Sequence, residues 1–310
     1  MRTTLDPNVI KPFDSWMNDY ELLIIHFDRI NRKTILGQKV GHCRFCKKSA
    51  PEVSFKQKAH ALPQFLGNNF LLSHYECDVC NEVFSRALEN EMANFMKPFH
   101  TILGIKGEKK IPIFKSKEVR FEFDEKGLII NSFNDSSLVG SLSEKEFSYN
   151  LKTDKFIPIG MYKCLTKMAL SIMPEADVAL FDRTFKWLQE KEHVNTEFEL
   201  DNLWVIYSQL LEDSTFPHMS ATLLKKRSLT SPLLPSFIFR LSYSKFSFQI
   251  YLPLCDLDID KKFTIHDFKY FPHLFDLTKG IETSEKIYID CTSKEKCEVP
   301  IDIDFKNLDK

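Results

Sequence analysis

Apolar side chains recur every three or four residues near the start of the chain, which favours an amphipathic helix over residues 14–32. Asp14 and Ser15 precede this pattern and suit the position that caps a helix N-terminus. The apolar members are Trp16, Tyr20, Leu23, Ile24, Phe27 and Ile30. The continuous run from Leu22 to Ile25 fits a strand equally well, so both interpretations stay open at this point.

Three later stretches also have helical spacing. Residues 78–95 form the first, and Pro98 is expected to end that helix. Residues 159–173 and 175–193 are separated by Pro174 and predict an antiparallel helical hairpin. The stripe of the first stretch consists of Phe84, Leu88, Met92 and Phe95. We interpret all these stripes as core packing.

Alternating or continuous apolar patterns predict strands elsewhere in the chain. Residues 119–123 and 128–132 alternate around a turn at Asp124–Gly127, which is typical of a β-hairpin. Residues 34–42 and 53–60 are expected to be extended, the second leading into a turn at Pro63. Further strands are expected at residues 203–207, 219–225, 237–241 and 246–252. This mixture of elements predicts an α+β fold.

Composition excludes several classes of protein. The 310 residues are 43% hydrophobic and 27% charged, as in a globular protein, and the formal net charge is -1. No apolar run approaches the roughly 18 residues that a membrane span needs, and no basic-then-apolar leader begins the sequence. We expect no membrane partner. Eight cysteines are too few for a disulfide framework in a chain of this size, so we expect a cytoplasmic, reducing location.

Two Cys-x-x-Cys pairs stand in one short segment, Cys43 with Cys46 and Cys77 with Cys80. Four thiolates in two such pairs are the typical ligand set of a tetrahedral structural zinc ion. The 30 residues between the pairs exceed the gap of a simple zinc ribbon, which is roughly 15–20 residues. This longer insert contains His60. We expect Cys291 and Cys297 to be free thiols, and Cys164 and Cys255 to lie on apolar faces.

The cysteine segment resembles the HNH endonuclease family in its zinc-bearing form. The resemblance rests on the CRFC knuckle, on KAHALPQFLGN from Lys58 to Asn68, and on ECDVCNEVFSRALEN from Glu76 to Asn90. It implies an N-terminal ββα-metal finger held together by zinc and followed by a mixed α+β C-terminal domain. By the same resemblance, His60 is the general base and Asn81 helps to hold a catalytic Mg²⁺ or Mn²⁺ ion.

Elementary chemistry agrees with these roles. Hydrolysis of a phosphodiester requires a water molecule made nucleophilic and a cation near the developing charge on the phosphate. A neutral imidazole can take the proton of that water at cellular pH. An asparagine oxygen is a ligand type that Mg²⁺ accepts.

The chain departs from the family pattern at two positions. Ala59 stands where a metal-binding residue usually precedes the histidine, and Leu72 and Ser73 stand where the central asparagine is expected. Another carboxylate must then complete the metal site. Glu89 is our candidate, because related zinc-bearing members often have an acid there. Glu76, Asp78, Glu82 and Asn90 stay open as alternatives.

Basic residues surround this segment in the sequence. Nine lysines and arginines lie between Arg29 and His60 against one acid, Glu52, and seven lie between Lys97 and Arg120 against two acids. Such blocks suit a phosphate backbone. We expect Lys47, Lys48 and Lys58 to contact nucleic acid, with DNA as the substrate and RNA left open.

Two domains are expected: residues 1–110 as the nuclease domain and residues 111–310 as a mixed α+β domain. The second domain could sense a ligand, bind a partner protein or form a homo-oligomer. By architecture the chain resembles HNH effectors of bacterial antiviral defence. The leading hypothesis is therefore a metal-dependent endonuclease. The alternative is a non-catalytic nucleic-acid-binding or assembly module that keeps the zinc-stapled fold.

Overall fold

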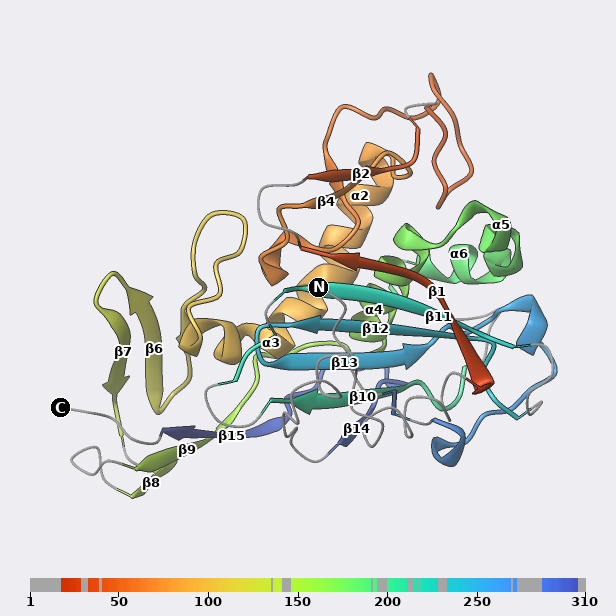
Figure 1. Ribbon diagram of the computed structural model, residues 1–310. Coiled ribbons are helices and arrows are strands. Elements are labelled where there is room, and N and C mark those ends of the chain that lie inside the picture. Colours follow the sequence, from red (N-terminus) through yellow and green to blue (C-terminus); the bar gives the residue numbers. More distant parts are fainter. Residues whose placement is uncertain are drawn as a thin grey trace, which may run out of the picture.

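The computed structural model shows a mixed α+β protein with one large sheet, three small sheets and few helices (Figure 1). It describes residues 18–28, 33–38, 41–134, 136–140, 146–190, 192–193, 200–210, 214–216, 218–227, 233–268, 270–271 and 286–305. The predicted fold class is confirmed. None of the helices in these residues is both long and apolar enough to cross a bilayer.

The large sheet has six antiparallel strands and contributes one wall of the main apolar core. All side chains of the two central strands, β12 and β13, are buried. In spatial order the strands are β1 (Tyr20–Phe27), β11 (Ser220–Lys226), β12 (Phe237–Tyr243), β13 (Phe246–Tyr251), β10 (Trp204–Gln209) and β14 (Ile287–Asp290). The hairpin predicted over residues 119–132 is found outside this sheet, and the strands predicted after residue 203 are found within it. All lie within a few residues of the expected positions.

The first strand corrects the prediction of a helix over residues 14–32. Tyr20–Phe27 pairs with β11, and the Tyr20 hydroxyl donates to the carbonyl of Pro235 at 2.8 Å. A shift of register between Leu22 and Ile24 interrupts the two-residue alternation. This β-bulge gives the apolar positions a helix-like spacing, so the alternative strand interpretation was correct. Trp16 and Ile30 lie outside the described residues.

Small sheets flank the large one. One consists of β2 (Thr34–Leu36), β4 (Leu71–Ser73) and β3 (Ala59–His60), so the strand predicted over residues 53–60 is only two residues long. The other two lie beyond the end of α3 (Figure 1). They consist of β5 (Phe114–Lys115), β6 (Val119–Asp124) and β7 (Gly127–Ser132), and of β15 (Pro300–Phe305), β9 (Phe147–Lys152) and β8 (Leu138–Gly140).

A continuous helical rod runs from residue 78 to residue 102. It consists of α2 (Asp78–Phe84), a π-helical turn η2 (Ser85–Glu89) and α3 (Asn90–Ile102). Pro98 was expected to end the helix, but it lies buried inside α3. Packing of this face therefore outweighs the local cost of about 3 kcal/mol that a proline imposes inside a helix.

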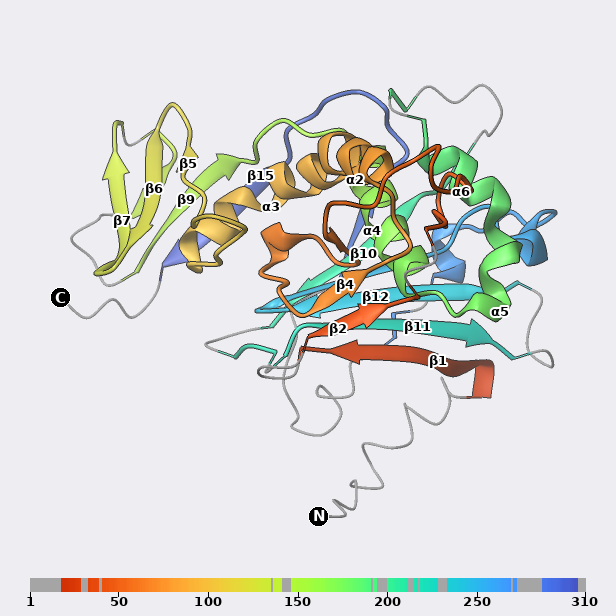
Figure 2. The same ribbon diagram turned by 90° about the horizontal axis from the view of Figure 1, so that it is seen from above.

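Helix α4 (Pro158–Ile172) lies between the helical rod and the large sheet, and every one of its residues is buried. Figure 2 shows the helices gathered on one side of that sheet. The second helix predicted after Pro174 is broken into α5 (Glu175–Val178), a 3-10 turn (Ala179–Phe181) and α6 (Asp182–Leu188). One hydrophobic cluster joins residues of the cysteine segment, α4 and the sheet.

Candidate active site

The four cysteines of the two pairs meet in one cluster. Their sulfur atoms all lie within 4.8 Å of one another, with Cys43 to Cys80 and Cys46 to Cys77 both at 3.8 Å. Tetrahedral zinc with Zn–S bonds of about 2.3 Å places its sulfurs about 3.8 Å apart. All eight cysteines are free thiols, so no disulfide competes for them. The cluster therefore has the donor set and the spacing of a structural zinc site.

Neighbouring groups favour the thiolate form at Cys43, whereas burial raises the pKa of Cys77 and the hydrogen bond with Cys43 raises the pKa of Cys80. The Cys80 thiol and the backbone amides of Cys46 and Cys77 hydrogen-bond to the Cys43 sulfur and lower its pKa to about 4. The side-chain amide of Gln189, which follows α6, contacts the Cys80 sulfur at 3.6 Å. Donors of this kind orient metal ligands and tune them. The cluster thus receives support from a residue more than a hundred positions away.

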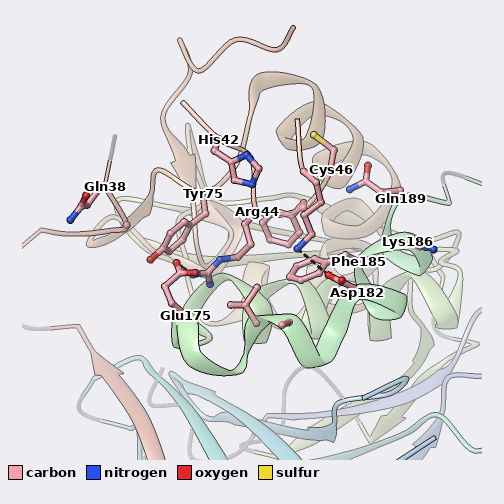
Figure 3. Close-up of a pocket in the computed structure, with 15 residues that line it drawn as sticks. Gln38, His42, Arg44, Cys46, Tyr75, Glu175, Asp182, Phe185, Lys186 and Gln189 are labelled. Atoms are coloured by element: carbon pink, nitrogen blue, oxygen red, sulfur yellow. Dashed lines mark hydrogen bonds and ion pairs between the residues drawn. The ribbon is translucent and has the colours of Figure 1, made fainter. Parts of the chain in front are cut away.

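The first knuckle is docked on the α5–α6 region, as Figure 3 shows. The buried Arg44 guanidinium lies 3.5 Å from the centre of the Tyr75 ring and forms an ion pair with Glu175. Lys47 forms an ion pair with Asp182 at 3.2 Å and lies over the Phe185 ring. These contacts border a pocket of about 1120 Å³. None of the residues that line this pocket is His60, Asn81 or Glu89.

His60 lies on β3, in the ββα order that the resemblance implied. β3 pairs antiparallel with β4, opposite Leu72, and α2 follows. The connection between the two strands is fixed by the buried amide of Asn68. Its nitrogen donates to the carbonyls of Leu62 and Leu71, and its oxygen accepts from the amides of Phe70 and Leu71. Asn68 therefore holds the loop closed behind the His60 strand.

A second clamp holds the segment that enters β3. The Asp78 carboxylate accepts hydrogen bonds from the Ser54 hydroxyl and from the backbone amides of Lys56 and Gln57. Its pKa is lowered because these hydrogen bonds outweigh the effect of burial. Asn81 donates through its side-chain nitrogen to the Gln57 side-chain oxygen at 2.9 Å, which leaves its own oxygen as an acceptor. Asn81 thus faces the segment that delivers His60.

The half-buried imidazole of His60 favours the neutral form. Burial lowers its pKa, the charges of Lys167 and Lys33 lower it further, and Glu108 opposes them. Its Nδ1 atom is buried and has no hydrogen-bond partner among the described residues. A neutral imidazole at neutral pH is the form that accepts a proton.

A buried charge cluster lies directly behind His60. The Lys167 ammonium of α4 donates to the His60 carbonyl at 2.8 Å and lies 3.1 Å from Glu76 and 3.5 Å from Glu89. The side chain of Glu76 is fully buried, whereas that of Glu89 is 20% exposed. Burial, with a smaller contribution from Glu89, raises the pKa of Glu76 to about 7 against the opposing effect of Lys167.

A π-helical turn ends at Glu89, the residue that lies close to the His60 main chain. It interrupts the rod between Asn81 and Glu89. A π turn contains more residues than an α turn and is often found at functional sites. Glu89 and the His60 carbonyl both contact the Lys167 nitrogen, so they are close neighbours.

The remaining candidate residues are all described, and none of them forms a side-chain hydrogen bond or ion pair with His60 or Asn81. Glu82 forms an ion pair with Arg86, Asn90 donates to the Arg86 carbonyl, and Lys48 forms an ion pair with Glu52. Lys58 is exposed, and no acidic partner for it is found in the described part of the chain. Ala59 is buried, and the hydroxyl of Ser73 accepts from the Tyr75 amide.

Comparison with known proteins bears on this geometry. Residues 43–96 match a family model described as HNH endonuclease. No curated protein and no solved structure matches the chain. We refer to residues 43–96 as the HNH finger.

Donors of the type that a hard divalent cation prefers are present in the HNH finger, since Asn81 offers an amide oxygen and Glu89 a partly exposed carboxylate. Mg²⁺ is often bound by only one or two protein carboxylates together with water. Among the described residues, only the four cysteines form a cluster of three or more cysteine, histidine or carboxylate ligands.

Two residues of this site were missed from the sequence. Asn68 carried a signal, because an asparagine after a glycine in a loop often bonds to its own backbone. Lys167 carried none, because a lysine in an apolar stripe is usually placed at the solvent edge of a helix. Only the tertiary structure brings it to His60.

Proposed function

We propose that this protein is a metal-dependent HNH endonuclease that hydrolyses phosphodiester bonds in DNA. The observation that carries the proposal is the position of His60, whose imidazole has a lowered pKa and stands on the β3 strand of a finger that matches HNH endonucleases. A residue of this kind is suited to remove a proton from water. A module that only binds nucleic acid has no need for it.

Each group of the site has a proposed role. His60 accepts the proton of the attacking water. Asn68 and Asp78 hold the two ends of the segment that carries His60. Asn81 and Glu89 would hold Mg²⁺ or Mn²⁺, which supplies positive charge for the phosphate and the leaving oxygen. Cys43, Cys46, Cys77 and Cys80 would hold a structural zinc ion.

Lys47, Lys48 and Lys58 are proposed to contact the DNA backbone, to different extents. Lys58 is exposed beside β3, whereas Lys47 and Lys48 each have an acidic neighbour in Asp182 and Glu52. An ion pair must be loosened before its lysine can neutralise a phosphate. Lys58 is therefore the strongest of the three candidates.

The second candidate function is a non-catalytic nucleic-acid-binding or assembly module. Ala59 favours it, because no ligand precedes His60, and so does Lys167, because its ammonium already forms ion pairs with Glu76 and Glu89. Metal-dependent cleavage distinguishes the two functions.

The wider setting is also a proposal. A cytoplasmic location accords with eight free cysteines. Residues 1–110 and 111–310 are proposed as a nuclease part and a part that senses a ligand, binds a partner protein or self-associates. A role in antiviral defence would give the second part the task of holding the nuclease inactive until a signal arrives.

The deciding experiment is incubation of purified protein with plasmid DNA and with RNA in Mg²⁺, Mn²⁺ or EDTA. We expect metal-dependent cleavage of DNA, and His60→Ala should reduce it by roughly 10²–10⁴-fold without loss of zinc. Asn81→Ala should be rescued in part by raised Mn²⁺, whereas His60→Ala should not.

Glu89→Gln tests the second ligand, since loss of activity with rescue by metal would assign it to the cation. Full activity of Glu89→Gln would move that role to Glu76, Asp78 or another group. Cleavage by His60→Ala at the wild-type rate would contradict the proposed function, as would a wild-type protein that cuts neither nucleic acid.

A further inference from the structure

Helix α4 lies outside the HNH finger, yet charged side chains of the finger hold both of its ends. At the N-terminus, the backbone amide of Ile157 donates to the Glu91 carboxylate at 2.6 Å. At the C-terminus, Arg44 donates to the carbonyls of Leu170 and Met173 at 2.9 and 2.8 Å. An acid at the start of a helix and a base at its end both complement the helix dipole. The finger therefore fixes the position of α4 along its axis.

Close packing fixes the rotation of α4. A Cβ atom at Gly160 would lie 2.7 Å from the Glu91 side chain and 3.2 Å from the carbonyl of Ala87. The helix therefore meets the π-helical turn at a position where only glycine fits without a shift. Lys167 follows Gly160 by seven residues, which is two helical turns, so it lies on the same face. This geometry aims the Lys167 side chain at the HNH finger.

The end of that side chain is held by three groups of the finger. Its ammonium contacts the His60 carbonyl, Glu76 and Glu89, and only 1% of the side chain is exposed. A buried ammonium is unfavourable unless it is paired and hydrogen-bonded. Neither oxygen of Glu76 receives an aligned hydrogen bond from the described residues, so the ion pair with Lys167 is what compensates its burial. The three groups and the lysine depend on one another.

We propose that Lys167 is a positioning residue of the nuclease site, which ties the main chain at His60 to Glu76 and Glu89 and so makes α4 a structural part of that site. This inference rests on the proposed function. Lys167 lies behind the imidazole-bearing strand and touches no reacting atom. It acts by holding β3 and the Glu89 carboxylate in a fixed relation.

The same helix contains a matched control. Lys163 is also fully buried, one turn before Lys167, but its ammonium donates to the Trp187 carbonyl in α6 and to the Glu190 carbonyl just after it, and it forms an ion pair with the Glu190 carboxylate. Replacing either lysine by methionine removes one buried charge from α4. Only Lys167→Met removes a contact with the HNH finger.

The test compares four full-length variants in zinc content, DNA affinity and cleavage rate. They are Lys167→Met, Lys167→Arg, Lys163→Met and the double variant Lys167→Met/Glu76→Gln. The double variant removes the carboxylate that Lys167 compensates, so it keeps the fold if the single variant does not. We expect it to bind zinc and DNA as the wild type does while its kcat falls about 100-fold, the loss typical of a displaced catalytic group. Lys167→Arg should restore part of kcat, and Lys163→Met should keep it.

A second readout separates this inference from the proposed function. In protein with ¹³C-labelled histidine, the His60 ring signal, assigned by its absence from His60→Ala, should move in the double variant and stay in place in Lys163→Met. Wild-type kcat in the double variant, or an unmoved His60 signal, would overturn the role of Lys167 alone. A wild-type protein that does not cleave, with a His60 signal that still responds to Lys167, would overturn the proposed function instead.

Discussion

The HNH finger and the six-stranded sheet share one apolar core but differ in what else holds them together. In the sheet, β12 and β13 are buried along their whole length, and aromatic rings such as Tyr243 and Phe248 stack on one another. In the finger, the strands β3 and β4 have two and three residues. Besides the apolar side chains that it contributes to the shared core, its order comes from four convergent thiols and from buried polar groups such as Asn68 and Glu76.

This difference separates stability from precision. Apolar burial is non-directional and spread over many weak contacts, so no single contact holds the sheet. Metal coordination and buried ion pairs fix particular atoms, and each fails when a single partner is lost. The finger is thus the more precise region and the more vulnerable one, and its position against α4 lets the sheet support it.

Removal of zinc should have the largest effect on folding, and that effect should be confined to the HNH finger. Cys77→Ser, or a strong chelator, should unfold the finger and leave the sheet folded, because structural zinc contributes roughly 10–16 kcal/mol of apparent binding free energy in small modules. Zinc analysis and proteolysis within residues 43–96 would measure it. Cys255→Ser, at a buried thiol outside the cluster, is the control. Pure wild-type protein without zinc would contradict this expectation.

Truncation of a core side chain in the sheet should have the next largest effect. It should destabilise the sheet and leave the zinc cluster of the finger intact. Phe239 is fully buried on β12, and Phe239→Ala should lower the free energy of unfolding by about 3–5 kcal/mol. Zinc content at room temperature should not change. Ile129→Ala, on the exposed side of the β6–β7 hairpin, should change stability by less than about 0.5 kcal/mol. Equal effects of both variants in thermal unfolding would contradict the assigned core.

Substitution of the surface lysines Lys58 and Lys48 should have a smaller effect than the two changes above, and it should alter DNA binding without altering stability. Lys58→Ala should weaken binding at all sequences and reduce the slope of log K against log salt by about 1, because one phosphate contact is lost. Lys48→Ala is the matched comparison and should change the slope less, since Lys48 forms an ion pair with Glu52. Titration at several salt concentrations gives the slopes. An unchanged slope in Lys58→Ala would mean that this lysine only faces solvent.

The smallest expected effect is on the pH dependence of cleavage. Because burial and nearby positive charge lower the pKa of His60, the acid limb of kcat/KM should lie below the ordinary imidazole value of about 6.5. Lys33→Met removes a positive charge, so it should raise that pKa and move the limb to higher pH. Glu108→Gln removes a negative charge and should move it to lower pH. Shifts in the same direction in both variants would contradict this electrostatic account.

Local chemistry was predictable from the sequence, and long-range placement was not. The spacing of the cysteines predicted a cluster that the structure assembles, and the turn at Asp124–Gly127 predicted the β6–β7 hairpin, because both signals are contained in adjacent residues. The bulge in β1 gave a strand the spacing of a helix. The prediction that Pro98 ends the helix was wrong for a related reason. The contacts that keep α3 helical around Pro98 come from residues distant in the sequence. The contact of Lys167 with His60 depends on how α4 packs, which no local pattern encodes.

The pairing of β1 with β11 has a consequence for the order of synthesis. Tyr20–Phe27 leaves the ribosome first, yet its partner Ser220–Lys226 is made almost two hundred residues later. At roughly 5–20 residues per second, bacterial and eukaryotic ribosomes separate the two by about 10 seconds or more. The HNH finger is completed within this interval, before α4 arrives to hold it. A nascent chain therefore passes through a stage in which the four clustered cysteines are present but the proposed nuclease site still lacks Lys167.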